Sequence, residues 1–192
     1  MSNNSENKLY TYADYLAYPE NERVEIIDGH IYAMSPSPSQ IHQEIITELT
    51  TSINNYIKSN KGDCKIYPAP FDVILKDATE DLNNSKTTIQ PDISVICDKN
   101  KLTDKGCIGS PDLIIEVVSP FNPNNDHIRK LGLYDHYKVR EYWIVNPMNG
   151  NILVYRLDGN GAYAAPETYS FKDKIKVGIY DDLEIDFSLI EL

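Results

Sequence analysis

Leu113-Ile-Ile-Glu-Val-Val118 is a continuous apolar run that contains one acidic residue, Glu116. A strand that is apolar on both faces is typical of the centre of a sheet covered by helices. A carboxylate inside such a strand must be paired, protonated or bound to a metal ion, because burying an unpaired charge is costly. Glu116 is therefore a candidate functional residue. The alternative is an ordinary ion pair with an Arg or Lys at the end of the strand.

A second acid stands beside a second apolar run. Pro91-Asp92 precedes Ile93-Ser-Val-Ile-Cys97, and Asp is a poor strand former. Asp92 is either a turn residue after proline or, if the two strands pair, a neighbour of Glu116 at one end of the sheet. Two carboxylates placed in this way supply the hard oxygen ligands that Mg²⁺ or Mn²⁺ prefers, with water completing the coordination.

A helix is predicted from residue 125 to residue 138, directly after the strand that holds Glu116. If this helix folds back onto the sheet end, the ammonium of Lys130 would lie near the acids, where it can orient a water and stabilise charge on a phosphate. Arg129 and Lys138 are then expected to point to solvent. The alternative for Lys130 is a solvated ion pair with Asp126, one turn earlier. The apolar face of the helix carries Ile128, Leu131 and Tyr134.

The remaining pattern indicates an α/β fold with one mixed sheet flanked by helices. A β-hairpin is expected around Asp28-Gly29, within residues 23–34. Isoleucine and leucine recur every three to four residues from residue 39 to residue 58, which predicts an amphipathic helix. Further elements are a short helix at 10–16, strands at 64–75, 89–97, 141–145 and 152–155, and short strands after residue 169. We expect residues 1–8 to form a disordered tail and residues 9–192 to form a single domain.

At this point the sequence resembles the Uma2 (DUF820) group of "putative restriction endonucleases". The resemblance extends over residues 12–155 and rests on Glu25 to Gly29, His42, Pro91-Asp92, Pro111 to Pro120, Asp126-x-x-x-Lys130-x-x-x-Tyr134 and Glu141 to Val145. It implies a restriction-endonuclease-like, PD-(D/E)XK fold in which Asp92 and Glu116 bind the metal ion and Lys130 is the catalytic lysine. In the usual Glu-x-Lys pattern the lysine stands two residues after the acid. Val118 holds that position here, so the resemblance implies that the lysine has moved to the helix.

Glu25, His42 and Tyr134 are secondary candidates within the same resemblance. Glu25 either faces outward from its hairpin strand or lines the site. His42, near the start of the long helix, either bonds a backbone group or contacts a phosphate.

The implied activity is hydrolysis of DNA phosphodiester bonds by a Mg²⁺- or Mn²⁺-dependent endodeoxyribonuclease. Cutting both strands would require a symmetric homodimer, because one site cuts one strand. Two other functions are open: a catalytically idle nuclease fold that acts as a binding module, and a hydrolase of small phosphoesters. Metal binding separates the nuclease from the first, and activity on a generic phosphodiester but not on DNA would favour the second.

Composition limits these options. The formal net charge of −11 argues against a broad basic surface for nucleic acid, although a bound divalent cation would offset charge locally. Cys64, Cys97 and Cys107 are an odd number at wide spacing, so we expect neither a disulfide framework nor a zinc site. The sequence has no apolar stretch long enough to cross a bilayer, and its first residues lack the features of a secretory signal, which favours a cytoplasmic location.

Overall fold

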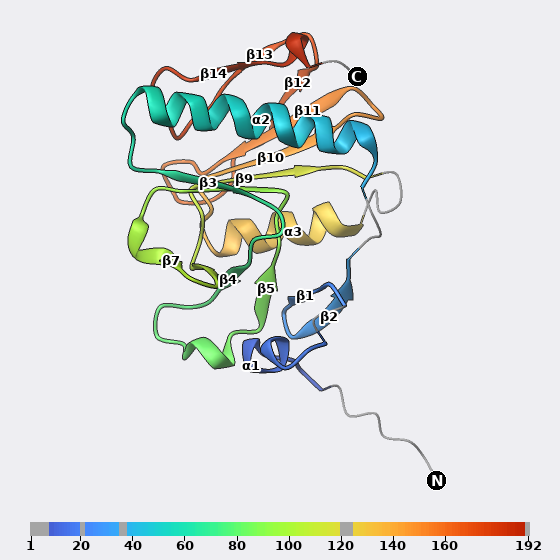
Figure 1. Ribbon diagram of the computed structural model, residues 1–192, viewed down its shortest axis with the longest axis vertical. Coiled ribbons are helices and arrows are strands. Elements are labelled where there is room, and N and C mark those ends of the chain that lie inside the picture. The colour runs from blue at the N-terminus through green and yellow to red at the C-terminus, as the bar shows by residue number, and fades with distance from the viewer. Residues whose placement is uncertain (1–7, 20–21, 35–37, 120–124, 191–192) are drawn as a thin grey trace.

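The protein consists of two mixed β-sheets with one helix between them and a second helix on the outer face of one sheet (Figure 1). In this computed structural model we describe residues 8–19, 22–34, 38–119 and 125–190, leaving out the side chains of residues 125–128. The α/β class expected from the sequence is confirmed. The second sheet was not expected.

The N-terminal part contains a short helix and the expected hairpin. Helix α1 (Tyr12–Leu16) begins after Thr11, which forms a capping box with Asp14. Strands β1 (Val24–Ile27) and β2 (His30–Ala33) pair in antiparallel register. Asp28 and Gly29 between them have φ angles of 51° and 79°, the left-handed conformation that a two-residue hairpin turn requires.

The hairpin forms one edge of the first sheet, whose strand order is β2-β1-β5-β4-β8-β7. Its other strands are β4 (Val73–Leu75), β5 (Thr87–Ile89), β7 (Leu102–Thr103) and β8 (Gly106–Ile108). Short 3-10 helices span Leu82–Asn84, Lys99–Lys101 and Phe187–Leu189.

The second sheet has the order β12-β11-β10-β9-β6-β3 and contains the apolar strand predicted to be central. Strand β9 (Leu113–Val117) is buried along its whole length, pairs in parallel with β10 and is antiparallel to β6. The other strands are β3 (Lys65–Pro68), β6 (Ile93–Ile96), β10 (Glu141–Asn146), β11 (Asn151–Arg156) and β12 (Glu167–Ser170). Strands β13 (Lys174–Lys176) and β14 (Glu184–Asp186) form a separate antiparallel pair.

The two long helices cover opposite faces of the second sheet, as Figure 1 shows. Helix α2 (Gln40–Ser59) buries an apolar stripe against the odd-numbered residues of β9 and against the C-terminal strands. Helix α3 (Asn125–His136) lies on the other face, where Leu133 and Tyr134 pack against residues of both sheets. Alternate residues of β9 therefore face different helices, and Glu116 points to the side of α3.

The sequence pattern predicted one strand at residues 64–75 and one at residues 89–97. In the structure, each of these segments forms two strands that belong to different sheets. Residues 64–75 form β3 in the second sheet and β4 in the first, and residues 89–97 form β5 in the first sheet and β6 in the second. Proline interrupts both runs, at Pro70 and at Pro91, because proline has no N–H for a strand ladder. The chain thus crosses from one sheet to the other at Pro91-Asp92.

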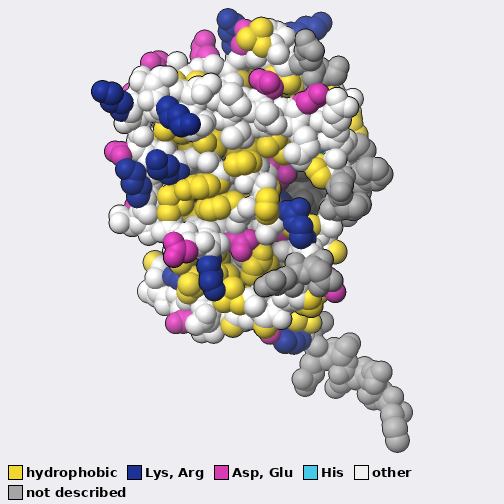
Figure 2. All heavy atoms as spheres, in the orientation of Figure 1, with side chains coloured by type: hydrophobic (Ala, Val, Ile, Leu, Met, Phe, Trp, Pro, Cys, Tyr) yellow, Lys and Arg dark blue, Asp and Glu magenta, His cyan; other side chains and the backbone are white. Residues whose placement is uncertain are grey.

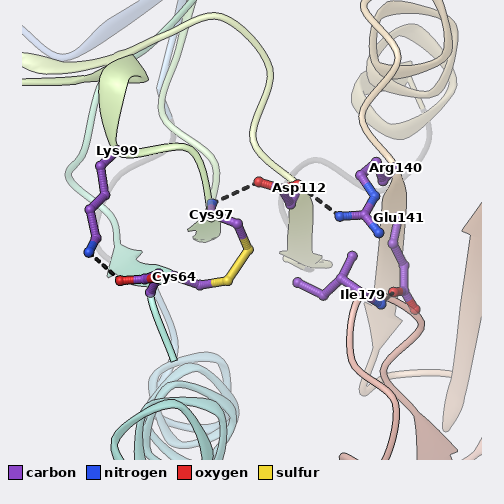
Figure 3. Close-up of a disulfide and its surroundings, with 8 residues drawn as sticks. Cys64, Cys97, Lys99, Asp112, Arg140, Glu141 and Ile179 are labelled. Carbon is purple, nitrogen blue, oxygen red and sulfur yellow. Dashed lines mark hydrogen bonds and ion pairs between the residues drawn. A yellow bond between two sulfur atoms is a disulfide. The ribbon is translucent and has the colours of Figure 1, made fainter. Parts of the chain in front are cut away.

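The expectation about cysteines was wrong, because Cys64 and Cys97 form a disulfide (Figure 3). Lys65 pairs with Ile96 across β3 and β6, so Cys64 and Cys97 follow as the next pair of the same ladder. A sequence separation of 33 conceals this pairing, which depends on strand register. Cys107 is a free, buried thiol whose pKa burial raises to about 12.

Two features of the structure bear on where the protein resides. Within the described ranges, no helix is both long enough and apolar enough to cross a membrane. Disulfides persist mainly in oxidising compartments, so the Cys64–Cys97 bridge does not favour the cytoplasm. The cytoplasmic location stays a prediction.

Candidate active site

Asp92 lies where the chain enters the second sheet, directly beside Glu116. Ile93 pairs with Ile115 across β6 and β9, and continuing this ladder by one residue sets Asp92 opposite Glu116. Directly opposite residues of an antiparallel pair have their Cβ atoms about 4.5–5.5 Å apart. The two candidate acids, which are 24 residues apart in the chain, are therefore neighbours at one end of the sheet.

A backbone N–H and the His42 ring contact one oxygen of the Asp92 carboxylate. The Val117 backbone N–H donates to Oδ2 at 2.8 Å, and Nε2 of His42 lies 3.3 Å from the same oxygen. His42 comes from the first turn of α2, which Ser39 caps by accepting the His42 backbone N–H. Among the described residues, no hydrogen bond engages the second oxygen, Oδ1.

Glu116 is 5% exposed, and two side chains of α3 bind its carboxylate. The Lys130 ammonium donates to Oε1 at 3.0 Å, and the Tyr134 hydroxyl donates to the same oxygen at 2.9 Å. Burial, and then the negative charge of Glu116, hold the pKa of Tyr134 well above its usual value. Tyr134 thus remains a protonated donor.

Lys130 connects the two sheets through a second carboxylate. Its ammonium lies 3.2 Å from Oε1 of Glu25 on β1, and this oxygen also accepts the backbone N–H of Gln90 at 2.9 Å. Lys130 is 3% exposed, so a solvated surface position is excluded. Glu25 is 6% exposed and faces the site rather than solvent. The side chain of Asp126, the other partner considered for Lys130, lies outside the described residues.

A cavity of about 690 Å³ gives access to these groups. Its wall includes Glu25, His42, Asp92 and Glu116. Lys130 and Tyr134 do not line it, so they bind the carboxylates from behind. The inner wall of the cavity is therefore acidic, and the buried ammonium of Lys130 lies behind that wall.

Arg129 was expected to point to solvent, and this expectation was wrong. Its guanidinium lies 4.1 Å from the centre of the Tyr32 ring, and both residues line the cavity. The face of the Tyr32 ring attracts the cation and provides a flat apolar support for it. Lys138 is exposed, as expected.

The oxygen donors suit a hard divalent cation with incomplete protein coordination. No group of three or more His, Cys, Asp or Glu side chains in the described ranges is placed to hold one metal ion. Mg²⁺ needs fewer protein ligands than three, because it usually binds through one or two carboxylates and retains water molecules that substrate phosphates can replace. Oδ1 of Asp92 and the neighbouring Glu116 fit that requirement.

Sequence patterns did not single out Arg23, Tyr32 or Gln90, which also line the cavity. Gln90 directly precedes Pro91-Asp92, and this position in the sequence could have indicated that Gln90 lies near the site. Tyr32 pairs with Glu25 across the hairpin, so its position depends on strand register.

Comparison with known proteins places the chain among uncharacterised relatives with a common fold. The model of the family Uma2, described as "Putative restriction endonuclease", matches residues 12–188. Two proteins of Synechocystis sp. (strain ATCC 27184 / PCC 6803 / Kazusa) are similar. "Uncharacterized protein slr1290" is 30% identical over 77% of this chain and 74% of its own length. "Uncharacterized protein sll1609" is 23% identical over 96% of each chain.

A solved structure shows the same fold. It is the "putative nuclease belonging to DUF820" from Anabaena variabilis ATCC 29413, with a TM-score of 0.70 over 88% of this chain and 89% of that one. At 20% identity, this likeness concerns the fold alone.

Proposed function

Since the chain belongs to the Uma2 family, described as "Putative restriction endonuclease", we propose that it is an endonuclease that hydrolyses DNA phosphodiester bonds with a divalent cation. The observation that carries the proposal is the position of Asp92 opposite Glu116 at the wall of a cavity, with the buried Lys130 bound to Glu116. A carboxylate pair of this kind is costly to bury, and metal binding gives a reason for it.

Asp92 and Glu116 would hold Mg²⁺ or Mn²⁺. When bound, the ion would lower the pKa of a water molecule and neutralise charge on the phosphate. The chain itself orients the ligands: the Val117 N–H binds Oδ2 of Asp92, and the His42 ring lies 3.3 Å from the same oxygen, which leaves Oδ1 for the cation. Lys130 and Tyr134 fix Glu116 in the same way.

Lys130 acts in this proposal as a positioning residue. Because its ammonium lies 3.2 Å from Glu25 and 3.0 Å from Glu116, it orients both carboxylates and offsets one of their two negative charges. Its location behind the acids keeps it from direct contact with a ligand in the cavity. It would therefore influence the attacking water through Glu116.

Plasmid cleavage tests the proposal. With Mn²⁺ or Mg²⁺ the parent protein should nick supercoiled DNA, and linear product would indicate that two copies act together as a homodimer. Asp92→Asn, Glu116→Gln and Lys130→Ala should each reduce the rate on the order of a hundredfold or more. Lys138→Ala removes an exposed lysine near the end of the same helix and should cut like the parent.

Calorimetry with Mn²⁺ gives an independent measurement. The parent should bind the ion, Asp92→Ala should not, and Lys130→Ala should retain binding. A parent protein that neither binds Mn²⁺ nor cuts DNA would favour the idle binding module. Hydrolysis of bis(para-nitrophenyl) phosphate without cleavage of DNA would favour a small-phosphoester hydrolase.

A further inference from the structure

The four arginines of the chain fall into two classes that differ in their partners. Arg140 lies 3.0 Å from Asp112, and Arg156 lies 3.1 Å from Glu141 (Figure 3 labels the first pair). Arg23 and Arg129 line the cavity, and the structure gives neither of them a carboxylate partner among the described residues. In a chain with 29 acidic and 18 basic residues, this difference calls for a reason.

Neutral groups hold both cavity arginines in place. Arg129 lies over the Tyr32 ring at 4.1 Å. Arg23 donates from Nη2 to Oε1 of Gln90 at 2.8 Å. A ring or an amide fixes the position of a guanidinium without cancelling its charge, whereas a carboxylate would neutralise it.

The Gln90 amide is itself oriented. Its Nε2 donates to Asp72 at 2.8 Å and to the Tyr15 hydroxyl at 3.2 Å, which turns Oε1 toward Arg23. The Gln90 backbone N–H binds Glu25, so the support of Arg23 is tied directly to the acidic wall. On the other side, Tyr32 pairs with Glu25 across the hairpin. Both cations therefore have defined partners and line the same cavity as the candidate metal ligands.

We propose that Arg23 and Arg129 bind phosphates of the substrate strand that neighbour the one being cut. This inference rests on the proposed nuclease activity and specifies its substrate as an oligonucleotide rather than an isolated phosphoester. Arginine suits this task because its planar fork matches phosphate oxygens. On the face shown in Figure 2, basic side chains stand mostly singly or in pairs among uncharged and acidic ones. The two arginines, which have no carboxylate partner among the described residues, place positive charge beside the acidic wall of the cavity, in a chain whose net charge is −11.

Two substrates separate neighbouring phosphates from the scissile one. An oligonucleotide has neighbouring phosphates, and bis(para-nitrophenyl) phosphate has a single phosphodiester. For the oligonucleotide, Arg23→Ala and Arg129→Ala should each raise KM about tenfold or more while kcat stays within about twofold, because charge-assisted hydrogen bonds to phosphate are lost. For the small substrate both parameters should be unchanged. Arg140→Ala, which removes an arginine paired with Asp112, is the matched control.

Binding in the absence of metal provides a second readout. In the Asp92→Asn background, anisotropy of a labelled oligonucleotide is measured over a salt series. Each arginine-to-alanine change should reduce the slope of log K against log salt by about 0.7–0.9, the value for one phosphate contact. Arg129→Lys should retain the parental slope, because it keeps the charge, and melting temperatures identify variants that fail to fold.

The outcomes are distinct. Equal losses on both substrates, or no loss on the oligonucleotide together with an unchanged salt slope, would overturn the assignment of the arginines. If the parent cuts neither substrate, the proposed activity fails. The salt slopes then still decide whether Arg23 and Arg129 contact phosphates.

Discussion

Replacing Lys130 by methionine should destabilise the protein strongly. Methionine keeps much of the side-chain volume but removes the cation that lies 3.0 Å from Glu116 and 3.2 Å from Glu25, two carboxylates that are about 95% buried. Removing one member of a buried ion pair costs about 3–5 kcal/mol. For a protein of this size each kcal/mol lowers Tm by roughly 2–4 °C, so we expect a fall of roughly 6–20 °C.

Urea unfolding followed by fluorescence measures this loss of stability. Trp143 is the only tryptophan and is fully buried, so its emission reports unfolding of the core. Lys174→Met removes an exposed lysine paired with Asp186 and should leave the unfolding free energy almost unchanged. Adding Glu25→Gln to Lys130→Met should recover part of the loss. A Lys130→Met variant as stable as the parent would refute the role of Lys130 as a counter-ion.

Three further predictions concern other parts of the fold. His42→Leu should lower Mn²⁺ affinity by about 10–100-fold in calorimetry, whereas His42→Gln, which keeps an N–H donor for Asp92, should retain most of it; equal affinities would leave His42 with a packing role. Burial raises the pKa of the Glu141 carboxyl, so proton binding by Glu141 stabilises the folded protein at low pH, and this stabilisation is lost as the pH rises through the raised pKa. Glu141→Gln should therefore remove the part of the pH dependence of Tm that comes from Glu141. Reducing Cys64–Cys97, verified by thiol labelling, should lower the unfolding free energy by about 3–4 kcal/mol, as loop closure over a separation of 33 residues implies, and an unchanged Tm would contradict it.

Local sequence patterns predicted the elements that carry the site. An acid within the apolar strand β9 and another before β6 drew attention to Glu116 and Asp92, and the register of these strands sets them opposite each other. The periodicity of α3 and its position after β9 suggested where Lys130 would lie. These inferences depend on neighbours in sequence and on one pair of strands, which is the range in which periodicity is informative.

Features that depend on long-range register could not be predicted. The Cys64–Cys97 bridge depends on the pairing of β3 with β6, and the support of Arg129 depends on the docking of the hairpin beside α3. The division of residues 89–97 between two sheets was also missed, because an apolar run does not specify its neighbours. Arg129 illustrates the general difficulty: nothing in its local sequence distinguishes it from a solvated residue.

The crossing of the chain at Gln90-Pro91-Asp92 has a mechanical consequence. Glu25 belongs to the first sheet, whereas Asp92 and Glu116 lie at the end of the second, so the carboxylates sit on two sheets that this tripeptide and other crossings of the chain connect. A small rotation of one sheet against the other would change the separation of the acids without breaking a strand ladder. Substitutions of Leu133, which packs against both sheets and does not line the cavity, would then alter the separation of the acids by changing the angle between the sheets.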